Sequence, residues 1–155
     1  MKKHTGYVLL AGFLPLVSLA GCDALSDILL PSTVMVSLVN ESPDYDVEVT
    51  LFYHDEDDIP EIVLTEIGTE RNYTIKPGET VSFTRDCDDL QAIIIEDAEL
   101  QTGLFRPDTH SGVLRIDENF ECGQEIVFTF THSDVLLDLD FGVLPTVRWR
   151  AVNSE

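Results

Sequence analysis

Short segments that alternate apolar and polar residues are the feature that most constrains the fold of this chain. Residues 33–40, 46–53 and 125–132 alternate with a period of two. Successive side chains of a strand point to opposite faces, so this period is typical of strands with one buried face. No long segment has the period of about 3.6 residues that marks an amphipathic helix. The first two segments flank the turn residues Asn40-Glu41-Ser42-Pro43-Asp44 and are predicted to form a hairpin.

Further short segments predict more strands, separated by the turn Lys76-Pro77-Gly78-Glu79 and by a loop over residues 100–110. The run Ala92-Ile93-Ile94-Ile95 is apolar at every position, which indicates a strand buried on both faces. About eight to ten short strands predict a single antiparallel β-sandwich of an immunoglobulin-like or related type, with a small β-barrel as the alternative. The domain is expected over residues 33–152, followed by a tail over 153–155. The additional predicted strands cover residues 62–65, 72–75, 81–83, 91–96, 113–116, 136–141 and 146–152.

The N-terminal segment combines the features of an export signal. Lys2 and Lys3 give a positive start, and residues 8–19 form an apolar stretch of 12 residues. A helix that crosses a bilayer needs about 20 apolar residues, so this stretch is too short for a span. It ends in Leu19-Ala20-Gly21-Cys22. These four residues resemble the lipobox of bacterial lipoproteins, in which an aliphatic residue and two small residues precede an invariant Cys.

This resemblance implies that residues 1–21 are removed as a signal peptide and that Cys22 receives a diacylglycerol group. Residues 22–32 would then form the lipidated N-terminus and a tether, whose last ten residues span at most roughly 35 Å. Two or three acyl chains such as palmitate hold a protein stably at a membrane. The implied location is the bacterial cell envelope, facing the periplasm or the exterior. Asp23 resembles an inner-membrane retention signal of enterobacterial lipoproteins, but the choice between inner and outer membrane stays open.

The charge of the chain is strongly negative. Asp and Glu number 29 and Lys and Arg number 9, which gives a formal net charge of −20. Removal of residues 1–21 would take two lysines and no acid, so the charge would become −22. Phosphate binding needs clustered Lys and Arg, so no nucleic-acid partner is expected, and an anionic membrane surface would repel the domain. Hydrophobic residues make up 44% of the chain, enough for a folded core.

Two cysteines remain after Cys22. An exported protein meets an oxidising compartment, so Cys87 and Cys122 are predicted to form one disulfide. It would join the beginnings of two core strands. A metal pair or a reactive thiol is the alternative, but no CxxC motif is present. The acids on both sides of Cys87 would also disfavour a thiolate.

The acidic loop residues Asp55, Glu56, Asp57 and Asp58 are the best candidates for a metal site. Clustered carboxylates supply the oxygen ligands that Ca²⁺ prefers. The motif of a calcium-binding helix–loop–helix is absent, here and in the clusters at residues 86–89 and 138–140. A solvated acidic surface is therefore the favoured interpretation, and no cofactor is expected unless these acids bind Ca²⁺.

The segment Arg148-Trp149-Arg150 is unusual because two arginines flank the only Trp. On a strand, Trp149 is expected to face the core together with Val147, and both arginines to face the other side. Cross-strand pairing of the arginines with acids is the favoured interpretation. The alternative is an interaction patch for a partner protein, since Arg and Trp are common hot-spot residues.

Motifs of catalysis are missing from the sequence. There is no GxSxG, SxxK, HExxH or phosphate-binding glycine loop, and no catalytic residue is assigned. The favoured function is a lipid-anchored, non-enzymatic structural or interaction module with an envelope protein as a possible partner. The alternatives are a small exported acid-dependent hydrolase and a calcium-binding domain. A concave site that joins carboxylates with a shifted pKa would favour the hydrolase.

Overall fold

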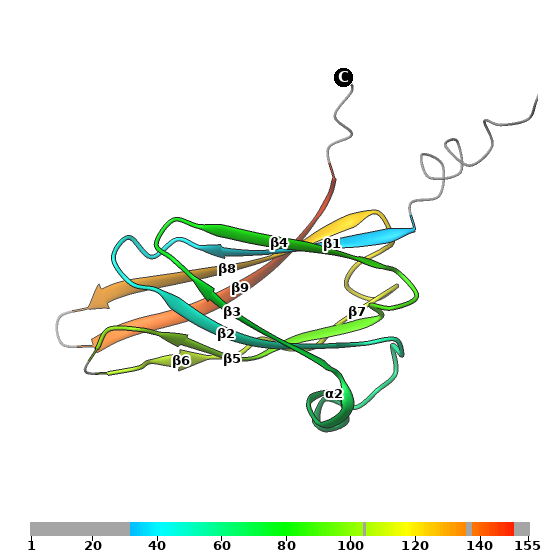
Figure 1. Cartoon of the computed structure of the whole chain (residues 1–155), viewed down its shortest axis with the longest axis horizontal. Coiled ribbons are helices and arrows are strands. Elements are labelled where there is room, and N and C mark those ends of the chain that lie inside the picture. Colours follow the sequence, from blue (N-terminus) through cyan, green and yellow to red (C-terminus); the bar gives the residue numbers. More distant parts are fainter. Residues whose placement is uncertain (1–31, 104, 136–137, 151–155) are drawn as a thin grey trace, which may run out of the picture.

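The computed structural model describes residues 32–103, 105–135 and 138–150. Two β-sheets pack face to face, and one short helix covers the outside of one of them (Figure 1). Sheet A has the strand order β4-β1-β8-β9, and sheet B has the order β3-β2-β5-β6, with β7 also paired to β5. The elements are β1 (Thr33–Asn40), β2 (Val47–His54), α2 (Glu61–Ile67), β3 (Thr69–Ile75), β4 (Thr80–Asp86), β5 (Ala92–Leu100), β6 (Asp108–Thr109), β7 (Leu114–Arg115), β8 (Gln124–Val135) and β9 (Asp138–Trp149).

The predicted sandwich is confirmed. Alternate residues of the strands point between the sheets and form the core, including Val36, Leu51 and Phe128, all without solvent exposure. The strands form two separate sheets rather than one closed sheet, so the small-barrel alternative is wrong. Most strand pairs are antiparallel, but β1 and β8 run parallel, which places the first and the last third of the chain side by side.

The predicted hairpin of the first two strands is wrong. β1 pairs with β4 and β8 in sheet A, whereas β2 pairs with β3 and β5 in sheet B. Asn40, which is fully buried, holds the turn that carries the chain between the sheets. Its Nδ2 donates to the carbonyl oxygens of Tyr45 and Ile75, and its Oδ1 accepts from the Ser42 N–H. The alternation identified both strands, but it carries no information on which sheet each strand joins.

The predicted strand over residues 62–65 is a helix in the structure. α2 begins after Pro60, whose extended backbone suits the position before a helix, and it has Glu61 in its first turn. Leu64 is the buried residue of the helix, and it packs with Phe52 and Ile94 on the outer face of sheet B. β-branched residues favour strands, but here packing against the sheet decides the local structure.

The helix explains why β5 is apolar on both sides. Ile93 and Ile95 face the main core, while Ala92 and Ile94 lie in the second cluster with Leu64. The prediction of a strand buried on both faces is therefore confirmed. The loop predicted over residues 100–110 contains the short strand β6, and the two last predicted strands are joined into the single strand β9.

Candidate functional site

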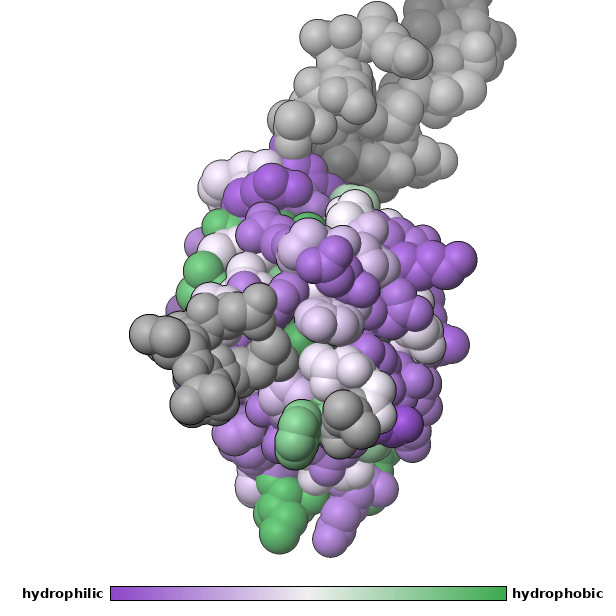
Figure 2. Space-filling model, turned by 90° about the vertical axis from the view of Figure 1, so that its left-hand side faces the viewer, coloured by the Kyte–Doolittle hydropathy of each residue, from purple (hydrophilic) through white to green (hydrophobic). Residues whose placement is uncertain are grey.

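The sandwich has two distinct ends. We call the end with Thr33, Asp86, Gln124 and Trp149 the tether end, because the chain enters the domain there. The opposite end, with Asn40 and the turn 76–79, is the far end. The surface seen from the far end is mostly hydrophilic, with hydrophobic residues scattered among the hydrophilic ones (Figure 2).

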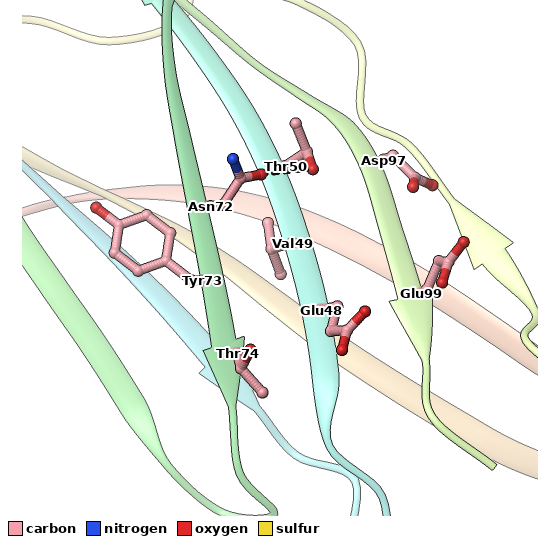
Figure 3. Close-up of a pocket in the computed structure, with 8 residues that line it drawn as sticks. All are labelled: Glu48, Val49, Thr50, Asn72, Tyr73, Thr74, Asp97 and Glu99. Atoms are coloured by element: carbon pink, nitrogen blue, oxygen red, sulfur yellow. Dashed lines mark hydrogen bonds between the residues drawn. The ribbon is translucent and has the colours of Figure 1, made fainter. Parts of the chain in front are cut away.

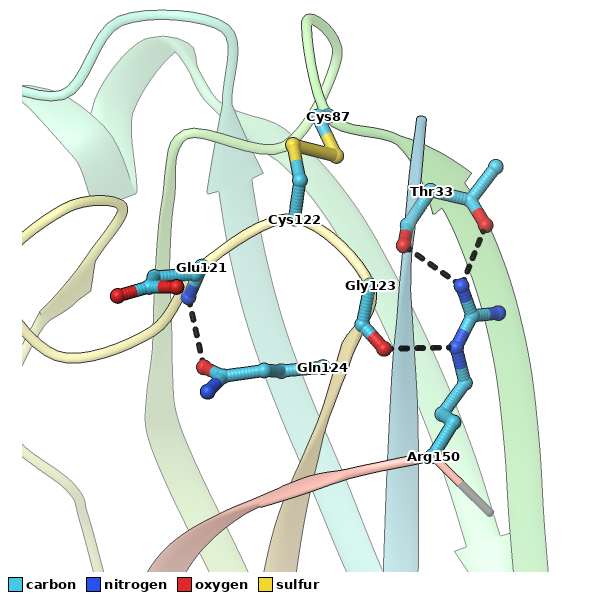
Figure 4. Close-up of a disulfide and its surroundings, with 7 residues drawn as sticks. All are labelled: Thr33, Cys87, Glu121, Cys122, Gly123, Gln124 and Arg150. Carbon is cyan, nitrogen blue, oxygen red and sulfur yellow. Dashed lines mark hydrogen bonds between the residues drawn. A yellow bond between two sulfur atoms is a disulfide. The ribbon is translucent and has the colours of Figure 1, made fainter. Parts of the chain in front are cut away.

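The predicted disulfide between Cys87 and Cys122 is confirmed, and it lies at the tether end (Figure 4). It joins the loop that leaves sheet A after β4 to the loop that enters sheet A at β8. The N–H of Cys87 also donates to the Ser32 carbonyl oxygen at 2.8 Å. The first described residue of the chain is therefore held next to the disulfide.

Arg150 completes this arrangement. Its Nη2 donates to the carbonyl oxygen and the hydroxyl of Thr33, both at 2.9 Å, and its Nε donates to the Gly123 carbonyl oxygen at 3.1 Å (Figure 4). The Gly123 N–H in turn donates to the Thr33 carbonyl oxygen at 3.0 Å. Arg150, which directly follows the last strand β9, thus ties the end of that strand to the beginning of β1 and to the loop before β8.

Arg148 belongs to a polar row that crosses all four strands of sheet A. Its Nε donates to Glu125 Oε2 at 2.8 Å, the hydroxyl of Ser37 donates to Glu125 Oε1 at 2.7 Å, and Ser37 shares a hydrogen bond of 2.8 Å with Ser82. Glu125 is 8% exposed. The hydrogen bond from Arg148 is the largest cause that lowers the pKa of Glu125, against the opposing effect of burial, and Ser37 adds to the lowering.

The prediction that Trp149 faces the core is wrong: the side chain is 62% exposed. Trp149 lies at the last position of β9, opposite Gln124, where the strand leaves the core. The expected pairing of Arg148 with an acid is confirmed, and Arg150 is bonded to backbone groups instead. Arg148 keeps 66% of its side chain exposed although it pairs with Glu125, so Trp149 and Arg148 are both open to a partner, and the patch stays a prediction.

The acidic loop Asp55–Asp58 lies at the tether end after β2, and its four side chains are exposed. Asp55 Oδ1 lies 3.0 Å from Nδ1 of His54, and the carbonyl oxygen of Asp57 accepts from Arg115. Over the described ranges, no group of three or more His, Cys, Asp or Glu side chains has an arrangement that could hold a metal ion. Ca²⁺ binding by Asp55, Glu56, Asp57 and Asp58 stays a prediction without structural support.

The outer face of sheet B carries a hollow of about 340 Å³ that sequence reasoning missed (Figure 3). Three carboxylates line it on neighbouring strands: Glu48 on β2, and Asp97 and Glu99 on β5. Glu48 is the direct cross-strand partner of Glu99, and Glu99 is the partner of Asp108 on β6. Like charges in such positions destabilise a sheet. The alternation of residues 46–53 placed Glu48 outward, but only the pairing of β2 with β5 brings the acids together.

Asp97 is the carboxylate of this hollow with a shifted pKa. Burial raises the pKa of Asp97, and the negative charges of Glu99 and Asp108 raise it further, against the lowering effect of the Ala98 N–H. Glu99 is held by Arg106 at 3.3 Å. Beside the acids, Thr50 donates its hydroxyl hydrogen to Asn72 at 2.8 Å. The hollow therefore has one acid that keeps its proton to a higher pH than an ordinary aspartate does.

Cys22, the predicted lipidation site, lies outside the described residues, as do the signal peptide and most of the tether. In the described part of the chain, no helix has the length and hydrophobicity needed to cross a membrane.

Comparison with known proteins does not show a family for this chain. No family model and no curated protein matches the sequence. The T6SS lipoprotein TssJ1 from Pseudomonas aeruginosa is similar with a TM-score of 0.43 and 12% identity, over 76% of this chain and 97% of that chain. A protein from Eubacterium rectale is similar with a TM-score of 0.41 and 11% identity, over 79% of this chain and 95% of that chain. At these values, neither likeness carries an argument about function.

Proposed function

We propose that this protein is a lipid-anchored interaction module of the bacterial cell envelope, held at its membrane through Cys22 and without enzymatic activity. The observation that carries the proposal is the lipobox-like sequence Leu19-Ala20-Gly21-Cys22, followed by a sandwich that begins at Thr33. A tether of about ten residues spans at most roughly 35 Å, so the tether end would face the bilayer.

The charge of the tether end supports a covalent anchor. The exposed acids of the loop 55–58 and of residues 86, 88 and 89 lie at this end. Anionic lipid headgroups repel such a surface, so electrostatic attraction would not hold the domain there. The acyl chains of Cys22 would supply the attachment that the surface charge opposes.

Metabolic labelling with a palmitate analogue tests the anchor. The wild-type protein should be labelled and should sediment with membranes, and Cys22→Ala should lose both properties. Asp23→Ser is the matched control, because it changes the neighbouring residue and keeps the acceptor sulfur. Label retained in Cys22→Ala, or a wild-type protein that is never labelled, would refute the lipid anchor.

The interaction role is tested at the exposed Trp149. In cross-linking from intact envelopes, Trp149→Ala should lose a partner band that the wild type gives, since exposed Trp residues often dominate binding. Leu144→Ala is the control, because Leu144 lies on the same strand and is also 62% exposed. Equal cross-linking by both variants would exclude the patch at Trp149.

The shifted pKa of Asp97 favours a second candidate function, an acid-dependent hydrolase at the hollow on sheet B. A carboxyl group that holds its proton can act as a general acid, and Glu48 or Glu99 would be the carboxylate beside it. Hydrolysis of chromogenic glycosides and esters below neutral pH, lost in Asp97→Asn and kept in Glu96→Gln, would support this candidate. No turnover in the wild type at any pH would reject it.

A further inference from the structure

Of the six arginines in the described part of the chain, four have no carboxylate partner. Among the described residues, Arg106 and Arg148 pair with glutamates, and Arg115 and Arg150 donate to backbone carbonyl oxygens. The other two are Arg71 and Arg85, neither of which has an Asp or Glu oxygen within 4.0 Å in that part of the chain. Arg85 also donates from Nη1 to the carbonyl oxygen of its neighbour Thr84 at 3.2 Å.

Arg71 and Arg85 act on the same tyrosine at the open side of the sandwich. They lie on β3 and β4, which are consecutive in the chain but belong to different sheets. Arg85 Nε donates to Tyr53 Oη at 2.9 Å, and the Arg85 guanidinium lies 5.6 Å from the centre of the Tyr53 ring. Burial raises the pKa of Tyr53, but both guanidiniums lower it and together prevail. Positive charge therefore converges on one phenolic oxygen.

A hollow of about 290 Å³, which we call the arginine hollow, opens beside this group at the tether end. Tyr53 and Arg85 line it together with two acids, Asp55 and Asp89. Neither acid lies within 4.0 Å of the guanidinium of Arg85. His54 also lines the hollow, and its Nδ1 lies 3.0 Å from Asp55 Oδ1. The hollow thus holds a guanidinium and two carboxylates that are not paired with that guanidinium, and the space between them is open to a ligand.

We propose that the arginine hollow binds a zwitterion that carries an oxyanion and a primary ammonium group, the chemistry of phosphoethanolamine. The oxyanion would accept from the guanidinium of Arg85 and from the hydroxyl of Tyr53, with Arg71 adding positive charge. The ammonium would donate to Asp55 and Asp89. The volume suits a headgroup-sized molecule, since pockets for larger drug-like ligands begin at roughly 300 Å³.

Two sources supply this chemistry: a free small molecule, or the headgroup of a phosphatidylethanolamine in the bilayer. The lipid source rests on the proposed anchor at Cys22, because the anchor brings the tether end to the membrane. The binding of the soluble zwitterion does not depend on the anchor. A failure of the proposed anchor at Cys22 can therefore be distinguished from a failure of the proposed binding site.

Calorimetric titration of the full-length protein in a maltoside detergent with O-phosphoethanolamine tests the site. Arg85→Gln should weaken binding more than tenfold, and Arg106→Gln, at an arginine already paired with Glu99, should leave it unchanged. Inorganic phosphate and ethanolamine, each with half of the zwitterion's charge pattern, should bind at least tenfold more weakly. No saturable binding of phosphoethanolamine, or equal affinities of the two arginine variants, would overturn the proposal.

Arg85 also packs on aromatic rings, so a second pair of variants guards against a folding defect. Asp89→Asn keeps the aromatic contacts and should reduce the affinity for phosphoethanolamine to that for phosphate. Asp88→Asn is its control, because Asp88 is an exposed neighbour that does not line the hollow. Equal affinities of Asp89→Asn and Asp88→Asn would show that Asp89 does not bind the ammonium group. That result would overturn the proposal of a zwitterionic ligand.

Reconstitution into nanodiscs separates the two sources. If headgroups fill the arginine hollow, soluble phosphoethanolamine should bind at least tenfold more weakly in phosphatidylethanolamine discs than in phosphatidylglycerol discs. The same affinity in both discs would support the site with a soluble ligand as its source. Loss of binding in both discs, with an intact fold, would overturn the site.

Discussion

Arg150 and Thr33 lie 117 residues apart in sequence, and the Nη2 of Arg150 donates to the Thr33 carbonyl oxygen at 2.9 Å. Arg150 directly follows β9 and Thr33 begins β1, and these two strands are not neighbours, because β8 lies between them in sheet A. Arg150 reaches across β8 and bonds to Gly123 on the way. The contact closes the tether end of the sheet without any ladder hydrogen bond between the first and last strands.

Arg150→Gln should lower the free energy of unfolding by about 1–3 kcal/mol, because hydrogen bonds from a charged group are lost and carbonyl oxygens lose their donor. Urea denaturation measures the change. Arg106→Gln is the control, since the Arg106 side chain is 61% exposed and such surface pairs contribute less than about 1 kcal/mol. A loss no larger than that of the control would mean that the Arg150 contacts do not stabilise the domain.

Removal of the disulfide should lower the free energy of unfolding by more than Arg150→Gln does. Cys87 and Cys122 are 35 residues apart, and a loop of that length corresponds to roughly 3–4 kcal/mol in the chain-entropy model. Cys87→Ser with Cys122→Ser should lower the melting temperature and raise amide exchange around Thr33. The wild type treated with a reductant is the matched comparison. Unchanged melting after verified reduction would contradict the stabilising role.

Glu125 predicts a specific pH dependence. Its pKa is lowered in the folded state, above all by Arg148, so its contribution is present above the ordinary glutamate pKa of 4.5. The contribution is lost as the pH falls through the lower pKa of the folded state. Glu125→Gln should therefore be less stable than the wild type near neutral pH, with a difference that shrinks in acid. Unfolding curves from pH 7 to pH 2 check this.

The control for that pH series is Glu121→Gln, at an exposed position two residues before Gly123. It removes a carboxylate without touching the hydrogen bonds among Ser37, Glu125 and Arg148, so at pH 7 it should cost less stability than Glu125→Gln. A Glu125→Gln difference that grows in acid would have the wrong sign for a carboxylate with a lowered pKa.

Gly68 ends α2 in a confined position. A Cβ at residue 68 would lie 2.4 Å from the backbone oxygen of Leu64, and the backbone there cannot move away cheaply. Gly68→Ala should destabilise the domain by about 1–3 kcal/mol, as overpacked positions do. Gly112→Ala is the matched control, because a Cβ at residue 112 would have no neighbour within 4 Å. Thermal denaturation of both variants gives the comparison.

Periodicity predicted most of the strands because burial on one face leaves a local record in the sequence. Val47, Val49 and Leu51 show this record clearly, and all three are buried. Helix α2 left no such record, since its Ile62 and Val63 are β-branched and only packing of Leu64 on sheet B selects the helix. The crossing of the chain from sheet A to sheet B after Asn40 could not be predicted either, because it depends on partners such as Ile75 that are distant in sequence.

The candidate sites likewise include one that the sequence predicted and two that it did not. The disulfide followed from the number of cysteines and the expected compartment, without any knowledge of strand order. The hollow at Asp97 and the arginine hollow each depend on strands or loops that meet only in the folded chain. Arg85 was an ordinary strand residue in the sequence, and its position beside Tyr53, Asp55 and Asp89 became visible only in the folded chain.

Because Arg150 contacts Thr33, the first and last residues of the domain lie close together. A short peptide could join the two ends, and the chain could be opened instead in the exposed turn 76–79, where Gly78 has a positive φ of 70°. Such a circular permutant would keep every strand pair and carry its new ends at the far end. A lipid on its new N-terminus would invert the domain on the membrane, so orientation could be varied independently of the fold.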